Sequence, residues 1–155
     1  MGTCLSFTLS RILCVDGDSN TLNWIKATLK DSKVDAVITY AKTGREAFTL
    51  LNKEDFDLCI LEYALPDMTG VQLCSLMRQM GSKVPMLFFT AMNRSIDREK
   101  ARAAGAADYL SKPDDMDMIV TAVIDQLTKR KPFYFERPRF SLLNGFSHQV
   151  RKSAA

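Results

Sequence analysis

Short apolar runs alternate along the chain with segments in which apolar residues recur every three or four positions. The first pattern is typical of strands buried on both faces, and the second is typical of helices with one apolar face. Because a helical segment follows each run, the pattern predicts an α/β fold with a parallel sheet between two layers of helices. The strands are predicted at residues 12–15, 34–40, 56–61, 84–90 and 108–110.

Polar residues and a glycine predict where several helices begin and end. Asp18 or Ser19 can cap the first helix, because a short polar side chain there accepts a hydrogen bond from a free backbone N–H group. Thr43 and Glu46 have the spacing of a capping box, which predicts the start of the second helix. Gly105 follows the fourth helix and is expected to adopt the left-handed conformation that ends many helices.

Helical spacing also predicts which side of each helix packs on the sheet. The fourth helix, at 95–104, is the exception, because it is charged and offers little apolar surface beyond Ile96 and its alanines. The clearest amphipathic helix is the last one, at 114–128. The inward-facing residues are predicted to be Leu22, Ile25 and Leu29 in the first helix, Ala47, Leu50 and Leu51 in the second, Leu73, Leu76, Met77 and Met80 in the third, and Met116, Ile119, Val120, Val123, Ile124 and Leu127 in the last.

Composition indicates one folded domain with an uneven charge distribution. The chain has 155 residues, of which 46% are hydrophobic and 25% are charged, an ordinary balance for a single domain. The net charge of +3 hides a basic end, since residues 129–155 carry seven Lys or Arg residues and one Glu. We therefore predict a leader at 1–8, a domain at 9–128 and a basic, aromatic tail at 129–155.

The predicted tail has three interpretations. Aromatic and cationic side chains alternate in it, a pattern that suits stacking on single-stranded nucleic acid or contact with an anionic surface. The same pattern suits an arm that packs on the domain or on a partner protein. We favour the packed arm, because aromatic side chains are costly to leave in water, and we do not expect nucleic acid as a partner.

Several classes of protein are excluded. No apolar stretch approaches the ~18 residues that a membrane-spanning helix needs. The first residues lack the basic and apolar regions of a secretory signal. The four cysteines form no C-x-x-C pair, and His148 is the only histidine, so a metal site made of cysteines and histidines, or a redox motif, is not expected. We expect a reduced, cytoplasmic protein that does not bind membranes.

Polar side chains follow the strands at the points where these end. Asp16 and Asp18 follow the first strand, Glu62 follows the third, Thr90 ends the fourth, and Lys112 follows the fifth. Because the carboxyl ends of parallel strands meet at one edge of a sheet, we expect these groups to lie close together. Carboxylates, a hydroxyl and a lysine suit a metal ion or a phosphoryl group, and the set contains no histidine or cysteine nucleophile.

Four segments resemble the receiver domain of bacterial two-component response regulators. They are the first strand with its acidic end (12–16), the sequence LPDMTG (65–70), the sequence FTA (89–91) and the sequence AAGAADYLSKP (103–113). The resemblance covers about residues 9–128. It implies a flavodoxin-like, doubly wound sheet with strand order 2-1-3-4-5, and a signalling module in a phosphorelay rather than an enzyme.

The resemblance also implies roles for individual residues. In this family an aspartate that ends the third strand accepts a phosphoryl group from a histidine kinase, and two acids after the first strand help it to hold Mg²⁺. Thr90 and Lys112 match the residues that receive the phosphoryl oxygens, and Pro113 follows in the same motif. Tyr109 matches the switch aromatic, and Asp16 matches the first acid.

Two positions depart from the family pattern: Glu62 stands at the phosphoacceptor position, and Gly17 stands at the position of the second acid. The longer side chain moves the carboxylate by about 1.5 Å, one C–C bond, which disturbs the alignment that phosphoryl transfer needs. Gly17 removes one oxygen ligand, so Asp16 and Glu62 are expected to hold Mg²⁺ weakly at best. Asp18 is an alternative ligand that equally suits the helix cap.

These departures favour an atypical receiver that works as a protein-interaction module without phosphorylation, with Glu62 paired to Lys112. One alternative is a phosphotransfer receiver that uses Glu62 or a nearby aspartate with weak Mg²⁺ binding. Another is a nucleic-acid or surface binder that acts through the tail and is regulated by the receiver. By resemblance, a kinase, an output protein or a second copy would bind through the face formed by 95–104, 108–110 and 114–128.

Overall fold

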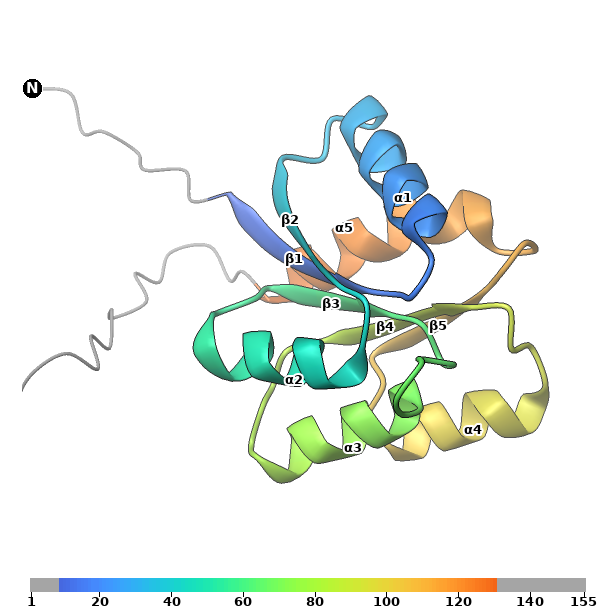
Figure 1. The fold of residues 1–155 in the computed structure, drawn as a ribbon. Helices are drawn as coiled ribbons and strands as arrows, with labels where there is room; N and C mark the ends of the chain where they lie inside the picture. The colour runs from blue at the N-terminus through green and yellow to red at the C-terminus, as the bar shows by residue number, and fades with distance from the viewer. Residues whose placement is uncertain (1–8, 131–155) are drawn as a thin grey trace, which may run out of the picture.

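A parallel five-stranded sheet lies between two layers of helices (Figure 1). The computed structural model describes residues 9–130. In chain order the elements are β1 (Ser10–Val15), α1 (Ser19–Asp31), β2 (Ala36–Ala41), α2 (Gly44–Lys53), β3 (Leu58–Leu61), α3 (Gly70–Gln79), β4 (Met86–Thr90), α4 (Ser95–Ala103), β5 (Asp108–Ser111), the 3-10 turn η1 (Met116–Met118) and α5 (Ile119–Arg130).

The strand order is β2-β1-β3-β4-β5, and every neighbouring pair is parallel. This order confirms the doubly wound topology that the resemblance to receiver domains implies. It places β1 and β3 side by side in the middle of the sheet, with β4 next to β3 and β5 at one edge. The carboxyl ends of these four strands therefore lie side by side at the same end of the sheet, which is where such folds build their sites.

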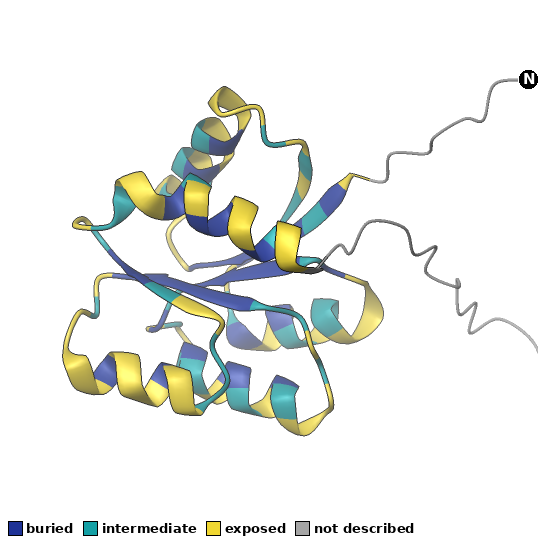
Figure 2. Ribbon diagram, turned by 180° about the vertical axis from the view of Figure 1, so that it is seen from behind, coloured by how far each residue is buried: buried dark blue, intermediate teal, exposed yellow. Residues whose placement is uncertain are grey.

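The two faces of the sheet have separate apolar cores. Alternate strand residues point to opposite faces, so that Leu13, Leu61 and Phe88 join one core while Ile12 and Phe89 join the other. In Figure 1, α2, α3 and α4 cover the first face, and α1 and α5 cover the second. The central strands β1, β3 and β4 are almost entirely buried, the edge strands β2 and β5 are partly exposed, and the helices are exposed on their outer sides (Figure 2), as expected for a sheet covered on both faces.

Some predicted inward-facing residues are exposed. Leu76 of α3 and Met80, the residue just after that helix, retain 41% and 58% of their surface, and Ile124 of α5 retains 46%. Ile96 of α4 is also exposed, while Asp97 and Ala101 of that helix are buried. Each helix rests on the sheet along a narrow line, so positions at the sides of a broad apolar stripe turn away from the core.

The observed helix caps agree in part with those that the sequence predicts. Asp18 caps α1, and Gly105 adopts a positive φ of 100° just after α4, as predicted. Thr43 accepts a hydrogen bond from the N–H of Glu46, but the Glu46 carboxylate accepts from the N–H of Lys42 instead of Thr43. The predicted capping box is therefore only half formed.

Several element boundaries differ from the predicted ones. The strand predicted at 34–40 begins at Ala36, because the N–H of Val34 still donates to the carbonyl of Leu29 at the end of α1. The helix predicted at 114–128 begins as η1 and continues as α5. The predicted leader and nearly all of the predicted tail lie outside the described residues, so both stay predictions. Within 9–130, no helix is long and apolar enough to cross a membrane.

Candidate functional site

The edge formed by the strand ends brings four of the predicted residues together. Asp16 follows β1, Glu62 follows β3, Thr90 ends β4, and Lys112 follows β5. The Lys112 ammonium lies 3.0 Å from Oε2 of Glu62 and 3.3 Å from Oδ2 of Asp16. One cation therefore bridges the two carboxylates. Pro113, which follows Lys112 in a cis peptide linkage, is exposed.

The environment of Lys112 favours its charged form. Burial by itself lowers the pKa of this ammonium, but the hydrogen bond and the charge of Glu62, together with the charge of Asp16, raise the pKa above its usual value. The ammonium also lies 5.1 Å from the centre of the Phe89 ring, a contact that favours a cation. Lys112 is consequently a cation at physiological pH.

The second carboxylate oxygen of Glu62 turns back toward its own strand end. Oε1 accepts hydrogen bonds from the hydroxyl of Thr90 and from the backbone N–H groups of Tyr63, at 2.7 Å, and Ala64, at 3.3 Å. Thr90 is completely buried. Both oxygens of Glu62 are thus engaged, one by neutral donors and one by Lys112.

Asp16 is buried and is also held by hydrogen bonds. It is 8% exposed, and its Oδ1 atom accepts a hydrogen bond of 2.8 Å from the N–H of Asp18. The Asp18 carboxylate points to α1, where it caps the N–H of Asn20 at 2.9 Å. The structure therefore brings Asp16 to the cluster and uses Asp18 as a helix cap.

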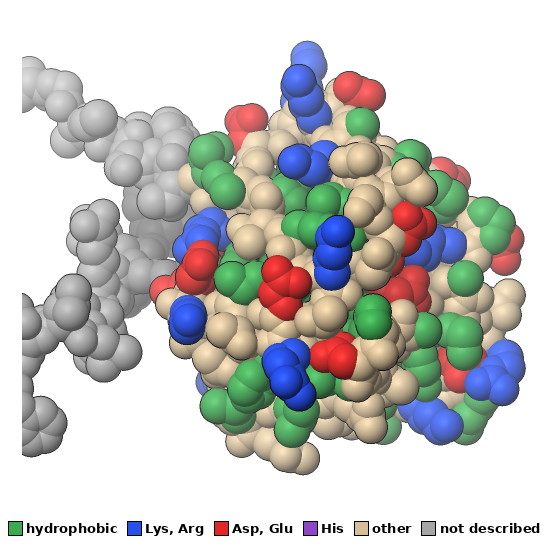
Figure 3. Space-filling model, viewed as in Figure 1, with side chains coloured by type: hydrophobic (Ala, Val, Ile, Leu, Met, Phe, Trp, Pro, Cys, Tyr) green, Lys and Arg blue, Asp and Glu red, His purple; other side chains and the backbone are tan. Residues whose placement is uncertain are grey.

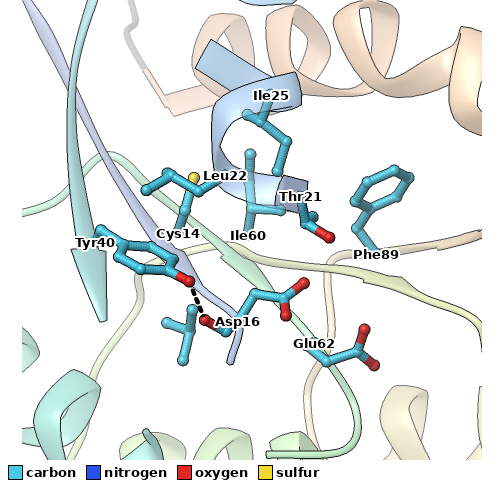
Figure 4. Close-up of a pocket in the computed structure, with 10 residues that line it drawn as sticks. Cys14, Asp16, Thr21, Leu22, Ile25, Tyr40, Ile60, Glu62 and Phe89 are labelled. Carbon is cyan, nitrogen blue, oxygen red and sulfur yellow. Dashed lines mark hydrogen bonds between the residues drawn. The ribbon is translucent and has the colours of Figure 1, made fainter. Parts of the chain in front are cut away.

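A small hollow separates the start of α1 from the ends of β1 and β3. Its walls include Asp16, Glu62, Thr21 and Tyr40, and the Tyr40 hydroxyl donates to the carbonyl of Asp16 (Figure 4). The hollow has a volume of only about 10 Å³, which is close to the space that one water molecule needs. It is too small for a substrate or a cofactor.

Gly17 leaves room beside this cluster. A Cβ atom added to Gly17 would lie 3.5 Å from Cγ of Pro66 and 3.8 Å from the carbonyl oxygen of Lys42, both ordinary contact distances. Its φ angle is not in the left-handed region. The backbone at this position can therefore accept a side chain without strain.

The loop after β3 is fixed by contacts that the sequence analysis did not find. The Asp67 carboxylate accepts hydrogen bonds of 2.8 and 2.9 Å from the N–H groups of Gly44 and Arg45, at the start of α2. These backbone hydrogen bonds lower the pKa of Asp67. At the other end of the loop, a Cβ atom added to Gly70 would lie 2.5 Å from the carbonyl oxygen of Glu62. The loop is therefore tied to α2 through Asp67, and its far end packs against the Glu62 backbone without room for a side chain.

Tyr109 points inward from β5 and is half-buried. Its ring stacks on Phe88, with 5.6 Å between ring centres and 9° between planes, and its hydroxyl donates to the carbonyl of Met92. The N–H of Met92 donates to the hydroxyl oxygen of Thr90 at 3.2 Å. Burial, and then the charge of Asp97, raise the pKa of Tyr109 to about 12. One residue, Met92, thus connects Tyr109 to Thr90 and through it to Glu62.

Comparison with known families assigns the chain. The family model of the response regulator receiver domain matches residues 12–124. The chain is 32% identical over 127 residues to the uncharacterized transcriptional regulatory protein YrkP of Bacillus subtilis, covering 82% of this chain and 53% of that protein. It is 31% identical over 139 residues to the response regulator RppA of Synechocystis, covering 88% and 57%. The chain belongs to the response regulator receiver domain family.

Solved structures agree with this assignment. A two-component response regulator from Clostridium difficile superposes with a TM-score of 0.70 and 28% identity, over 77% of this chain and 97% of that one. The receiver domain of a LuxO repressor protein from Vibrio parahaemolyticus gives a TM-score of 0.73 and 26% identity, over 79% and 93%. Receiver domains are signalling modules that interact with kinases or with output proteins. The chain spans about half the length of the first curated relatives it matches.

Proposed function

We propose that this chain is an atypical receiver, which binds a protein partner in a two-component-type pathway without being phosphorylated. The observation that carries the proposal is the double engagement of Glu62, by Lys112 on one oxygen and by Thr90 on the other. Glu62 stands where the family has its phosphoacceptor aspartate. Its carboxylate already contacts the two residues that match the family's ligands for the phosphoryl oxygens.

The engagement of Glu62 opposes its use as a nucleophile. An attacking carboxylate oxygen must lie in line with the phosphorus atom, about 3–3.5 Å away, at the moment of transfer. Oε1 accepts from three donors and Oε2 faces Lys112, so both oxygens would first have to leave these partners. The partners would also have to turn to the incoming phosphoryl group, which they cannot do while they hold Glu62.

The same contacts argue against a resident Mg²⁺ ion. Mg²⁺ needs near-octahedral oxygen ligands and is usually held through one or two carboxylates. In this cluster Oδ1 of Asp16 accepts from a backbone N–H group, and the remaining oxygens of Asp16 and Glu62 are occupied as described. Among residues 9–130, no group of three His, Cys, Asp or Glu side chains has the arrangement of a metal site. We therefore propose that the cluster holds no resident Mg²⁺ ion.

Charge supports the same conclusion. Asp16, Glu62 and Lys112 sum to −1, whereas a site with a third carboxylate in place of Gly17 would sum to −2. With less repulsion between carboxylates, the cluster needs no divalent cation. We propose that Lys112 takes over this task, and that the cluster holds the signalling surface in one conformation.

The partner surface is assigned to α4, β5 and α5, as expected from the resemblance to the family. A groove of about 420 Å³ lies along α4 and β5, and its walls include Arg98, Glu99, Arg102 and Asp108. In the view of Figure 3, basic and acidic side chains are interspersed at the lower right, where α4 lies in Figure 1. Such a mixed surface suits a protein partner, a second copy included, better than it suits nucleic acid.

Intact-mass analysis tests the proposal. The chain is incubated with Mg²⁺ and a small acyl-phosphate donor, beside a conventional receiver that labels under the same conditions. We expect no mass increase of one phosphoryl group on this chain. Peptide mapping that places such a group on Glu62, Asp16 or Asp18 would overturn the proposal and establish a phosphotransfer receiver.

A matched variant tests the reason for the expected result. The double variant Gly17→Asp/Glu62→Asp restores both family acids, and the room beside Gly17 allows its new side chain. We expect this variant to gain Mg²⁺-dependent labelling. If it stays unlabelled while it is folded, the two departures are not what prevents phosphorylation, and the argument from Glu62 fails.

The alternative that assigns binding to the tail falls outside the described residues. A chain truncated after Arg130 distinguishes binding by the tail from binding by the α4–β5–α5 surface. If the shortened chain loses partner binding, and if binding by the full chain falls steeply with added salt, the tail is the binding element. Unchanged binding by the shortened chain supports the α4–β5–α5 surface.

A further inference from the structure

Helix α4 has few apolar contacts to hold it on the sheet. Its buried residues are Asp97 and Ala101, and its only large apolar side chain, Ile96, is 44% exposed. Arg94, the residue just before α4, pairs with Asp97 at 2.9 Å, which satisfies the buried carboxylate without joining α4 to another element. Since apolar burial supplies most of the stability of a surface helix, another contact must hold α4 in place.

Arg98 makes contacts of this kind. Its guanidinium donates to the carbonyl of Tyr109 at 3.2 Å, to the hydroxyl of Ser111 at 2.5 Å and to the carboxylate of Asp115 at 3.4 Å. These three acceptors lie on β5 and on the loop that follows it. A planar guanidinium with several donors suits such a set, and a lysine would not reproduce it.

The acceptors are themselves fixed. The Asp115 carboxylate accepts a hydrogen bond of 2.8 Å from the N–H of Ser111, and the N–H of Asp115 donates to the carbonyl of Ser111 at 2.8 Å. Ser111 is buried and immediately precedes Lys112. Arg98 therefore connects α4 to a rigid turn next to the Lys112–Glu62 pair.

Arg98 also covers Tyr109. The guanidinium carbon lies 4.9 Å from the centre of the Tyr109 ring, within the range of a cation–π contact. The same ring stacks on Phe88 in the core. Any outward rotation of Tyr109 would have to break the stack on Phe88 and move past Arg98.

We propose that Arg98 is a clamp that holds α4 against β5 and keeps Tyr109 packed on Phe88. The clamp acts from the outer side of β5, whereas Thr90 and Met92 hold Tyr109 from the strand ends. It does not depend on whether Glu62 accepts a phosphoryl group, so it goes beyond the proposed function. Because the side chains of Arg98 and Asp115 are 42% and 34% exposed, the clamp is open to solvent and to an acidic group of a partner.

Hydrogen exchange of α4 and β5 tests the clamp in the folded chain. In Arg98→Ala we expect amides of 95–111 to exchange about tenfold faster than in the wild type, since charge-assisted hydrogen bonds are lost from a helix with little apolar burial. Arg98→Lys is expected to recover only part of the protection. Arg102→Ala is the matched control, because Arg102 lies one turn further along α4 and is exposed, and it should leave exchange unchanged.

A second measurement follows the ring directly. Contacts between the Tyr109 and Phe88 ring protons, observed by NMR, should weaken in Arg98→Ala and persist in Arg102→Ala. Asp115→Asn removes the partner charge but keeps an acceptor for Ser111, and it should shift both readouts in the same direction by less. Unchanged exchange and unchanged ring contacts in Arg98→Ala would overturn the proposal, as would an equal effect of Arg102→Ala. Neither readout involves phosphorylation, so this test and the labelling test can fail separately.

Discussion

The ammonium of Lys112 lies between Glu62 and Asp16, 3.0 Å from the first carboxylate and 3.3 Å from the second. The two acids follow neighbouring strands in the middle of the sheet, β3 and β1, and the lysine follows the edge strand β5. Three separate parts of the chain are therefore joined at one point. The strength of this junction and its consequences for metal binding can be measured.

Removing the charge of Glu62 should weaken the fold. In Glu62→Gln the amide cannot form the ion pair with Lys112, so that Lys112 pairs with Asp16 alone. We expect the free energy of unfolding to fall by about 1.5–3 kcal/mol, the range for a hydrogen bond to a charged group. Urea titration followed by circular dichroism measures the change. Glu54→Gln is the comparison, since Glu54 pairs with Arg11 on the exposed surface, where a salt bridge contributes little; equal losses in the two variants would contradict the prediction.

Adding an acid at Gly17 should create a response to Mg²⁺. Gly17→Asp places a third carboxylate beside Asp16 and Glu62 at a position with room for it. We expect Mg²⁺ at ten times its dissociation constant to stabilise this variant by about 1.4 kcal/mol and to leave the wild type nearly unchanged. Thermal unfolding with and without Mg²⁺ gives both values. Gly17→Asn has the same shape without the charge and should not respond; a wild-type response as large as that of Gly17→Asp would show that the native cluster already holds the ion.

Tyr109 should make the protein less stable in alkali. Its pKa is raised to about 12 by burial and by the charge of Asp97, while a tyrosine in the unfolded chain titrates near 10. The folded chain keeps the proton that the unfolded chain loses, so the stabilisation is complete below pH 10 and is lost between about pH 10 and 12. Unfolding free energies of the wild type and Tyr109→Phe, measured from pH 8 to 11, should converge as the pH rises. A constant difference between the two proteins would contradict the assigned burial of Tyr109.

Gly70 should be intolerant of a side chain, and Gly17 should tolerate one. A Cβ atom at Gly70 would lie 2.5 Å from the carbonyl oxygen of Glu62 and 3.0 Å from the Phe88 ring, so the loop after β3 must move. We expect Gly70→Ala to cost about 1–3 kcal/mol, as overpacking of a core does. Gly17→Ala meets no atom closer than 3.5 Å and should stay within about 0.5 kcal/mol of the wild type. Chemical denaturation of the two variants checks the contrast, and similar losses would refute it.

The sequence predicted most of the fold because one pattern repeats. Apolar runs followed by helical segments determine a parallel sheet, and the residues that follow the strands must then meet at one edge. Asp16, Glu62, Thr90 and Lys112 are adjacent in the structure for this reason. Their proximity is a consequence of topology, so it could be anticipated without knowledge of any side-chain conformation.

The remaining features depend on contacts between distant segments. Asp67 caps α2 from a loop that is remote in sequence, and no local pattern marks it. Asp97 is buried in a helix that reads as solvent-exposed, because Arg94 neutralises it. The exposed positions of Met80 and Ile124 reflect how each helix is rotated on the sheet, which the width of an apolar stripe does not determine.

The charges that hold the strand ends together all belong to the chain itself. In a phosphorylated receiver, the bound group is added by one protein and lost by hydrolysis, so the signal has a lifetime set by chemistry. A cluster made of Asp16, Glu62 and Lys112 has no transferable group that could be added or hydrolysed. If the proposed function holds, the lifetime of the signal is not set by a reaction of this protein. Its output would depend on the amount of the protein in the cell and on the rate at which its partner dissociates.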